Sequence, residues 1–309
     1  MIHFLKLIRY QNLLMLALMQ LIFRYGFLKS QNVPLALADW QYILFVISTV
    51  CIAAAGYIIN NIFDQDTDGE NKPNNVIIGK QISESNAYNY YVALNIIGVG
   101  IGFYLSNVIQ RPSFAAVFIL IAATLYFYAT SMKQSLLIGN IIIALLLSTS
   151  VLLIGVFDLL PATYEENRPV MAILFRILID YAIFAFIINF IREIVKDLED
   201  VNGDYNQGMS TLPIILGVAR TSKIVFALSF IPIIAILYYI NAYLFANGLL
   251  ISTIYGLIFI LSPLLYFTVK IWSAEKPKDF HHLSVVLKWI MFFGILSILV
   301  INYNMKHHA

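Results

Sequence analysis

Long apolar runs alternate with short polar segments along the whole chain. A membrane-spanning helix needs about 20 apolar residues. Runs of this length lie near residues 11–29, 41–60, 87–108, 113–131, 136–157, 170–192, 222–243, 249–270 and 286–303. No run alternates apolar and polar residues in the period of two that barrel strands show. The pattern therefore predicts an all-α membrane protein, a bundle of nine transmembrane helices that forms a single domain over residues 1–309.

The composition supports this fold class and excludes several functions. Of 309 residues, 61% are hydrophobic and 12% charged, and the mean hydropathy of +0.83 lies outside the range of soluble domains. A net charge of +2 without a basic stripe argues against a nucleic-acid partner. The single cysteine, Cys51, excludes a disulfide framework and a cysteine-based metal site. Because no small-residue cleavage site follows the first apolar run, we expect that helix to be retained rather than removed as a signal peptide.

Basic residues are divided unequally between the two sides of the predicted bundle. If the N-terminus is cytoplasmic, thirteen of the nineteen Lys and Arg residues fall on the cytoplasmic side. This bias predicts an integral membrane protein of the cell inner or plasma membrane, with its N-terminus inside and its C-terminus outside. The long polar segments 61–86, 193–221 and 271–285 then face the cytoplasm. Arg24 lies within the first run and must either pair or extend to the interface.

Two acidic clusters follow apolar runs on the predicted cytoplasmic side. The segment 60–73 reads NNIFDQDTDGENKP, and the segment 192–204 reads REIVKDLEDVNGD. Together they hold nine of the seventeen acidic residues. If the second helix continues past the membrane, the spacing of four places Asn60, Asp64 and Asp68 on one face. Such clusters repel themselves unless a cation is bound, so we expect a shared Mg²⁺ site.

The basic residues near both clusters indicate the class of substrate. Lys72 and Lys80 accompany the first cluster, Arg192 and Lys196 the second, and Lys133 lies in a short loop between predicted helices. A metal ion with fixed cations suits a diphosphate, both for binding and for departure as a stabilised anion. The run from Asp64 also resembles an EF-hand opening, but Asn75 stands where that loop needs a bidentate Glu, so we reject a calcium loop.

These motifs resemble those of the UbiA superfamily of intramembrane prenyltransferases. The first cluster is similar to the NDxxDxxxDxxxxRP signature, carried by Asn60, Asn61, Asp64, Asp68 and Lys72-Pro73. The second is similar to the DxxxD motif, carried by Asp200 and Asp204. Arg9 and Asn12 resemble an RPxN motif, and Tyr128 to Lys133 with Gly139-Asn140 resembles YSxxLK…GN. Asn61 replaces the usual Asp, Lys72 replaces Arg one residue closer, and Tyr10 replaces Pro.

The resemblance implies a Mg²⁺-dependent transfer of a long isoprenyl chain from its diphosphate to a membrane-associated acceptor. Its implied metal ligands are Asp64, Asp68, Asp200 and Asp204, with Asn60 assisting. Its implied diphosphate-binding residues are Arg9, Lys133, Lys72 and Arg192, and Tyr128 is placed to stabilise an allylic cation. Asn12, Asn61, Lys196 and Asp197 have implied supporting roles.

Several alternatives stay open for the acceptor and for the function. The second cluster looks most like the digeranylgeranylglyceryl phosphate synthase branch, whose acceptor is geranylgeranylglycerol phosphate. Aromatic prenyltransferases of quinone biosynthesis (4-hydroxybenzoate, dihydroxynaphthoate or homogentisate type) share the motifs. A transporter is a remote alternative, because nearly all acids lie at helix ends and Arg176 with Asp180 reads as a structural pair. The spacing of the two clusters also suggests an internal repeat of a four-helix unit.

Overall fold

The computed structural model describes residues 2–71 and 76–307, apart from the side chains of Asp68, Glu70 and Asn71. Lys72, one of the predicted diphosphate-binding residues, therefore lies outside the described residues. Within these ranges, nine helical spans are long and apolar enough to cross a membrane. They are Tyr10–Gln31, Asp39–Phe63, Glu84–Val108, Pro112–Thr130, Ile138–Ala162, Arg168–Glu199, Val218–Phe245, Leu250–Ile271 and Pro277–His307. The prediction of nine transmembrane helices is confirmed.

Several of these spans combine α-helical, π-helical and 3₁₀ turns. The α-helices are α1 (Ile2–Leu7), α2 (Tyr10–Leu21), α3 (Asp39–Phe63), α4 (Gln65–Asn71), α5 (Glu84–Val108), α6 (Ala115–Thr130), α7 (Ile138–Ile154), α8 (Arg168–Asn206), α9 (Leu212–Leu216), α10 (Val218–Tyr239), α11 (Leu250–Tyr255), α12 (Ser262–Ile271) and α13 (Pro277–His307). The π-helical turns are η1 (Ile22–Phe27), η5 (Gly155–Leu159), η7 (Ile240–Phe245) and η8 (Gly256–Leu261). The 3₁₀ turns are η2 (Leu28–Gln31), η3 (Pro112–Phe114), η4 (Met132–Gln134) and η6 (Leu160–Ala162).

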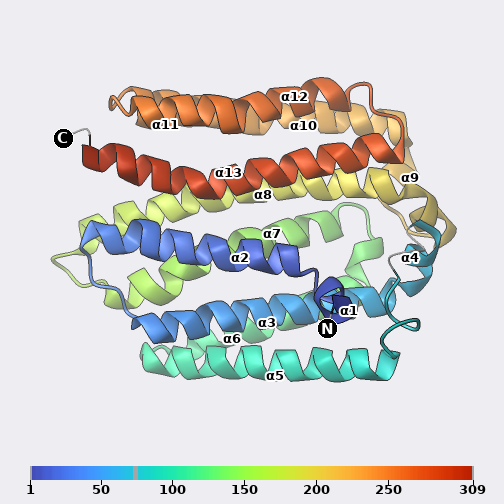
Figure 1. The fold of residues 1–309 in the computed structure, drawn as a ribbon, viewed down its shortest axis with the longest axis horizontal. Coiled ribbons are helices and arrows are strands. Elements are labelled where there is room, and N and C mark those ends of the chain that lie inside the picture. The colour runs from blue at the N-terminus through green and yellow to red at the C-terminus, as the bar shows by residue number, and fades with distance from the viewer. Residues whose placement is uncertain (1, 72–75, 308–309) are drawn as a thin grey trace.

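The long helices run side by side, with α5 at one edge of the bundle and α10 to α12 at the other (Figure 1). Helix α3 packs against α2, α5 and α6, while α8 packs against α7, α10 and α13. Two large apolar cores lie in the bundle, and α8 contributes its first half to one and its second half to the other. In the first core, the centre of the Phe157 ring lies 5.5 Å from the centre of the Phe45 ring and 5.2 Å from the centre of the Phe118 ring. The second core joins α8, α10, α12 and α13 around residues such as Phe267 and Leu287.

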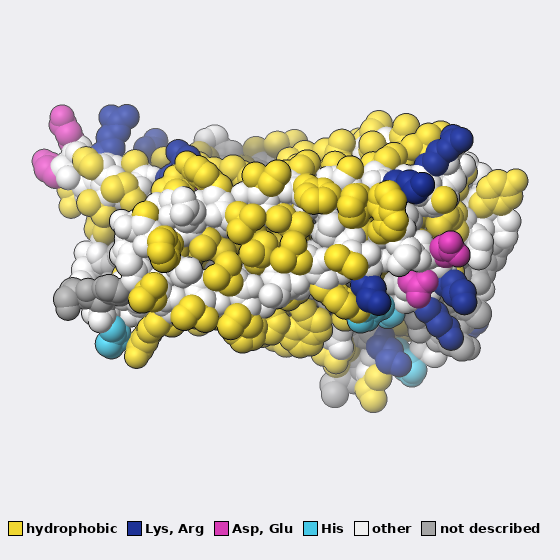
Figure 2. Space-filling model, turned by 90° about the horizontal axis from the view of Figure 1, so that it is seen from above, with side chains coloured by type: hydrophobic (Ala, Val, Ile, Leu, Met, Phe, Trp, Pro, Cys, Tyr) yellow, Lys and Arg dark blue, Asp and Glu magenta, His cyan; other side chains and the backbone are white. Residues whose placement is uncertain are grey.

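Apolar side chains cover the middle of the molecule, and charged side chains gather towards its two ends (Figure 2). Large apolar residues are strongly exposed on the outer helices, among them Ile96, Leu120, Ile234 and Val269. Contiguous apolar surface of this kind marks contact with an apolar partner in place of water. The protein is an integral, multi-pass membrane protein, and this surface faces lipid.

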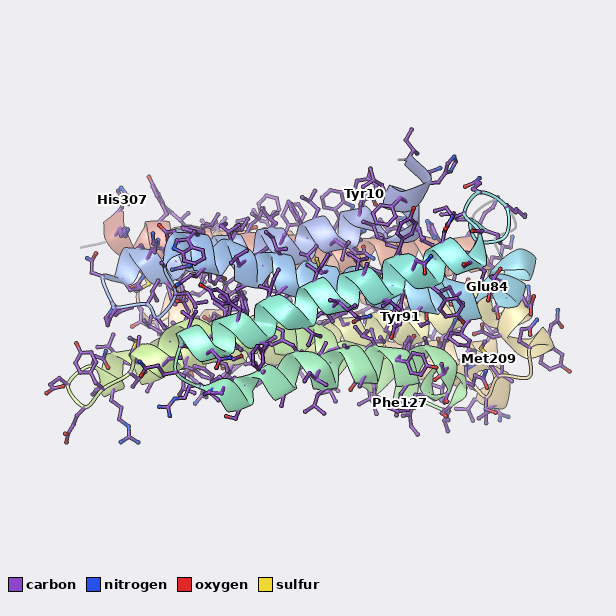
Figure 3. All side chains as sticks on the ribbon, turned by 90° about the horizontal axis from the view of Figure 1, so that it is seen from below. Tyr10, Glu84, Tyr91, Phe127, Met209 and His307 are labelled. Carbon is purple, nitrogen blue, oxygen red and sulfur yellow. The ribbon has the colours of Figure 1, made fainter. Side chains whose placement is uncertain are left out.

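The bundle has two ends that differ in sequence. The acidic end, as we call it, carries α4 and the last turns of α8; Glu84 and Met209 lie there, whereas His307 lies at the opposite end (Figure 3). Helix α8 has 39 residues, about 58 Å at 1.5 Å per residue, whereas the hydrocarbon core is about 30 Å thick. Its final turns therefore project beyond the core, as the polar sequence 192–206 requires.

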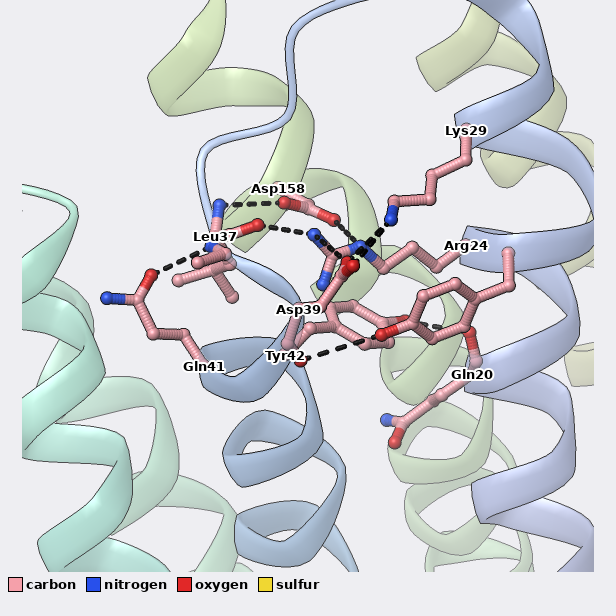
Figure 4. Close-up of polar contacts among 10 residues, drawn as sticks. Gln20, Arg24, Lys29, Leu37, Asp39, Gln41, Tyr42 and Asp158 are labelled. Carbon is pink, nitrogen blue, oxygen red and sulfur yellow. Dashed lines mark hydrogen bonds and ion pairs between the residues drawn. The ribbon is translucent and has the colours of Figure 1, made fainter.

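At the opposite end, Arg24 pairs with Asp158 (Figure 4). This is one of the two outcomes expected from the sequence for an arginine inside a membrane helix. The Arg24 Nε and Asp158 Oδ2 atoms are 3.1 Å apart, and both residues are almost fully buried. Arg24 also donates to the Leu37 carbonyl oxygen, and its guanidinium carbon lies 4.3 Å from the centre of the Tyr42 ring. The Leu37 N–H donates to Asp158 Oδ1 over 3.0 Å. This network fixes the loop between the first two spans.

One local expectation from the sequence differs from the structure. The second membrane helix does not continue unbroken, because Asp64 has φ −95° and ψ 6° and separates α3 from α4. The change of direction lets α4 pack against α8. The polar segment 271–285 is largely helical, since α13 begins at Pro277.

Candidate active site

A cavity of about 190 Å³ opens within the bundle towards its acidic end. Six of the residues predicted for the site line it: Arg9, Asn12, Asn60, Tyr128, Arg192 and Lys196. They come from the α1–α2 junction and from α2, α3, α6 and α8. Deeper in the membrane the lining is apolar, with Leu16, Ile52, Phe118, Ile121, Leu125, Leu146 and Leu153. The cavity therefore joins a polar, cationic region to an apolar one.

Arg9 reaches this cavity because the chain bends at that residue. Its φ of +49° is in the left-handed region, and it separates α1 from α2. A non-glycine residue in this conformation costs about 1–3 kcal/mol and is found preferentially at functional sites. The Arg9 guanidinium carbon lies 5.4 Å from the centre of the Tyr57 ring, within the range of a cation–π contact. Asn12 Nδ2 donates to the Tyr57 hydroxyl over 3.1 Å.

Helix α8 contributes a polar face whose residues recur every three or four positions. Asn189, Glu193, Asp197 and Asp204 follow this spacing, which places them along one side of the helix. Lys196 Nζ lies 2.8 Å and 3.0 Å from the two carboxylate oxygens of Glu193. Arg192 Nη1 lies 3.5 Å from Glu193 Oε1.

The charges that line the cavity do not balance. Its described lining includes the cations Arg9, Arg192 and Lys196 but only one carboxylate, that of Glu193. In a partly desolvated site such an excess of positive charge attracts an anion strongly. The cavity is thus suited to a ligand with an anionic head and an apolar body.

The first acidic cluster lies beside the cavity rather than in its lining, except for Asn60. Asp64 is buried and ion-paired with Lys133, and Asn60 Nδ2 donates to Asp64 Oδ2 over 2.5 Å. The Asn60 Oδ1 atom is buried and has no hydrogen-bond partner among the described residues. Asn61 points elsewhere, because its Nδ2 donates to the Tyr57 and Leu7 carbonyl oxygens.

Residues 131–140 connect the two acidic clusters. Lys133 pairs with Asp64 of the first, and Asn140 Nδ2 donates to Asp197 Oδ2 of the second over 2.8 Å. The Ser210 N–H, just after α8, donates to the Gln134 carbonyl oxygen over 3.0 Å. A Cβ atom at Gly139 would lie only 3.1 Å from the Lys133 Cα, so a glycine permits this tight packing. Together with the α4–α8 contact, these interactions place the two clusters at the same end of the bundle.

The residues present fit a hard cation that is shared with a ligand. Oxygen atoms are the ligands Mg²⁺ prefers, and it is commonly held by one or two carboxylates with substrate phosphates and water. The unpartnered Asn60 Oδ1 supplies one such oxygen, and the carboxylate of Asp64, which is held by Lys133 and by Asn60 Nδ2, supplies others. Among the described residues, no group of three or more His, Cys, Asp or Glu residues is arranged to hold a metal by itself. The side chain of Asp68 lies outside the description, Asp200 lies in the last turns of α8, and Asp204 is buried there.

Two residues that contact the predicted cations of the cavity, Tyr57 and Glu193, had no assigned role in the sequence interpretation. Tyr57 lines the cavity three residues before Asn60, on the same face of α3, and Glu193 lies four residues before Asp197 on α8. Helical spacing from the recognised motif residues would have identified both. Their contacts with Arg9 and Lys196, in contrast, depend on packing between helices or on side-chain orientation.

Comparison with known proteins finds relatives that cover nearly the whole chain. The model of the UbiA prenyltransferase family matches residues 18–296. The digeranylgeranylglyceryl phosphate synthase of Methanobrevibacter smithii is 28% identical over 294 residues, covering 94% of this chain and 96% of that protein. A solved structure described as digeranylgeranylglyceryl phosphate synthase has a TM-score of 0.63 at 22% identity, covering 97% of both chains. A UbiA homologue from Archaeoglobus fulgidus bound to DMAPP and Mg²⁺ has a TM-score of 0.58 at 17% identity, covering 96% of this chain and 98% of that one. At these identities, the two structures show a shared fold.

Proposed function

The chain belongs to the UbiA prenyltransferase family, and we propose that it transfers a geranylgeranyl group from its diphosphate to geranylgeranylglycerol phosphate, forming an ether. One observation carries this proposal: the cavity joins three cations to an apolar lining inside the membrane. A long isoprenyl diphosphate has the same division into an anionic head and an apolar tail. The acceptor is suggested by the named relative from Methanobrevibacter smithii, which spans nearly the whole chain.

The cavity residues have distinct roles in the proposed reaction. Arg9, Arg192 and Lys196 neutralise the donor diphosphate, while the apolar lining holds the isoprenyl chain and excludes water. The bond between C1 of the donor and the diphosphate oxygen breaks, and the diphosphate leaves with the bonding electrons. The acceptor hydroxyl oxygen bonds to C1, and its proton passes to the departing diphosphate. The rings of Tyr128 and Tyr57, which both line the cavity, offer π faces to the allylic cation that develops.

We assign metal binding to the acidic clusters. A divalent metal is associated with the family, since the Archaeoglobus fulgidus homologue binds Mg²⁺ with DMAPP. In this chain Asn60 and Asp64, with Asp68, Asp200 and Asp204, would hold Mg²⁺. When bound, the metal neutralises the diphosphate and so stabilises it as a leaving group. Lys133 places a further cation beside Asp64. From the sequence, Lys72 is assigned to diphosphate binding and Asp197 to a supporting role near the metal.

We also propose that the acidic end faces the cytoplasm. This orientation rests on the excess of Lys and Arg in the segments at that end, including Lys6, Lys80, Lys276 and Lys278. The excess follows the positive-inside rule. A cytoplasmic site has direct access to Mg²⁺ and to the diphosphate group of the donor.

The proposal is tested by incubating the purified protein in nanodiscs with Mg²⁺, geranylgeranyl diphosphate and a panel of acceptors. The panel contains geranylgeranylglycerol phosphate, 4-hydroxybenzoate, dihydroxynaphthoate and homogentisate, and products are identified by mass spectrometry. We expect the ether product from the glycerol phosphate alone. A prenylated aromatic product without any ether product would contradict the proposal and assign the chain to quinone biosynthesis.

A further inference from the structure

A second cavity of about 150 Å³ adjoins the first, between α2, α8 and α13. The two cavities share part of their lining, including Asn12, Tyr57 and Arg192. Most of the remaining lining is apolar and comprises Leu13, Met15, Met19, Phe23, Val151, Met291 and Ile295. The protein therefore has room for a second amphiphile whose head lies next to that of the first.

The polar residues of the second cavity lie at the same end as Arg192. Asn189 is one helical turn from Arg192 on α8, and Lys288 faces them from α13. Arg192 Nε donates to the Ser284 carbonyl oxygen over 3.3 Å, one turn before Lys288 on α13. This bond holds the Arg192 side chain against α13, one helical turn from Lys288.

Lys288 is partly buried in this apolar setting without a compensating carboxylate. The described lining of the cavity contains no Asp or Glu, and within residues 2–71 and 76–307 Lys288 forms no ion pair. A cation withdrawn from water in this way is costly unless an anion joins it. Lys288, which has no carboxylate partner among the described residues, and Arg192, which shares Glu193 with Lys196, together match the charge of a phosphate monoester more closely than that of a single carboxylate.

We propose that the second cavity binds the acceptor, with its phosphate held by Lys288 and Arg192 and its apolar tail between α2 and α13. This inference rests on the proposed function and extends it to a specificity site. On α8 the cavity reaches from Arg192 to Tyr181, about 16 Å along the helix axis, which gives the tail an apolar path. The donor diphosphate and the acceptor phosphate then lie on opposite sides of Arg192, which lines both cavities.

The test compares steady-state kinetics of the wild type and Lys288→Met in nanodiscs. Loss of one charge-assisted hydrogen bond should raise the KM for geranylgeranylglycerol phosphate by about 10-fold to 100-fold, with the KM for geranylgeranyl diphosphate changed less than about 2-fold. Lys288→Arg should restore most of the acceptor affinity. The matched control is Lys270→Met, an exposed lysine outside these cavities, which should behave as the wild type.

A second arm uses the wild type alone and so does not depend on the folding of any variant. Geranylgeranylglycerol, which lacks the phosphate, should compete with the acceptor at least about 10-fold more weakly than the phosphorylated form does. An unchanged acceptor KM in folded Lys288→Met, or equal competition by the two forms, would overturn the inference while leaving the proposed function intact. Absence of transfer to any glycerol phosphate acceptor would instead overturn the proposed function and this inference with it.

Discussion

Both ends of the bundle bury charged side chains, but they do so in opposite ways. At the end drawn in Figure 4, the cations Arg24 and Lys29 are matched by the carboxylates Asp39 and Asp158. At the acidic end, three cations and one carboxylate line a cavity. The charges of the first arrangement are matched within the protein, whereas the positive charges that line the cavity are in excess and leave room for an anionic ligand.

The comparison teaches that a buried charge does not by itself mark a functional site. Arg24 is the more unusual residue in the sequence, since it lies inside a membrane helix, yet it serves to join a helix, a loop and Asp158. In the sequence, Arg192 and Lys288 look like ordinary charges of the side predicted to be cytoplasmic, yet they line cavities. A buried charge indicates a functional site when no opposite charge in the protein balances it and a cavity lies beside it.

The largest effect is expected for Asp64→Asn at the acidic end. This change keeps an acceptor for the Asn60 amide but removes the charge that pairs with Lys133 and is assigned to Mg²⁺. We expect turnover to fall at least about 100-fold, since an electrostatic contribution of several kcal/mol is lost. Mass-spectrometric product assays in nanodiscs measure this effect, and thermal unfolding verifies that the variant is folded.

Asp66→Asn is the matched control for that change. Asp66 belongs to the same acidic cluster but is exposed to solvent. Its substitution should leave turnover within about 2-fold of the wild type, because exposed substitutions away from special features have small effects. Near-normal turnover of folded Asp64→Asn would contradict the assignment of metal binding to Asp64 and, with it, a functional difference between the two ends.

A smaller effect, on stability rather than activity, is expected for Arg24→Met at the opposite end. It leaves Asp158 buried without its partner and should lower the free energy of unfolding by about 3–5 kcal/mol. Turnover per folded molecule should stay unchanged because neither Arg24 nor Asp158 lines either cavity. Denaturant unfolding in micelles and active-site-normalised assays measure the two quantities separately.

The double variant Arg24→Met/Asp158→Leu sharpens this comparison. Replacing both members of a buried pair by apolar residues is often neutral or stabilising. The double variant should therefore recover most of the stability lost in Arg24→Met. A stable Arg24→Met protein that has lost transfer would show that the opposite end contributes to the reaction.

Hydropathy predicted the membrane spans, and so it predicted that both acidic clusters lie at the ends of membrane helices, because membrane crossing depends on local composition. It could not predict which helical faces meet. The pairing of Lys133 with Asp64 and the contact of Asn140 with Asp197 both arise from tertiary packing. The same holds for the approach of Arg192 to α13. The bend at Asp64 escaped prediction because the spacing of four suited a continuous helix. The internal four-helix repeat stays a prediction.

The location of the metal tests the central claim most directly, namely that both acidic clusters bind one diphosphate. Crystals grown with Mn²⁺ and an unreactive geranylgeranyl thiodiphosphate would locate the ion by its anomalous scattering. We expect the ion or ions beside Asn60 and Asp64, with the diphosphate held between them and the last turns of α8 that carry Asp200. A metal bound at the opposite end of the bundle, or a diphosphate that contacts only one of the two clusters, would contradict the claim.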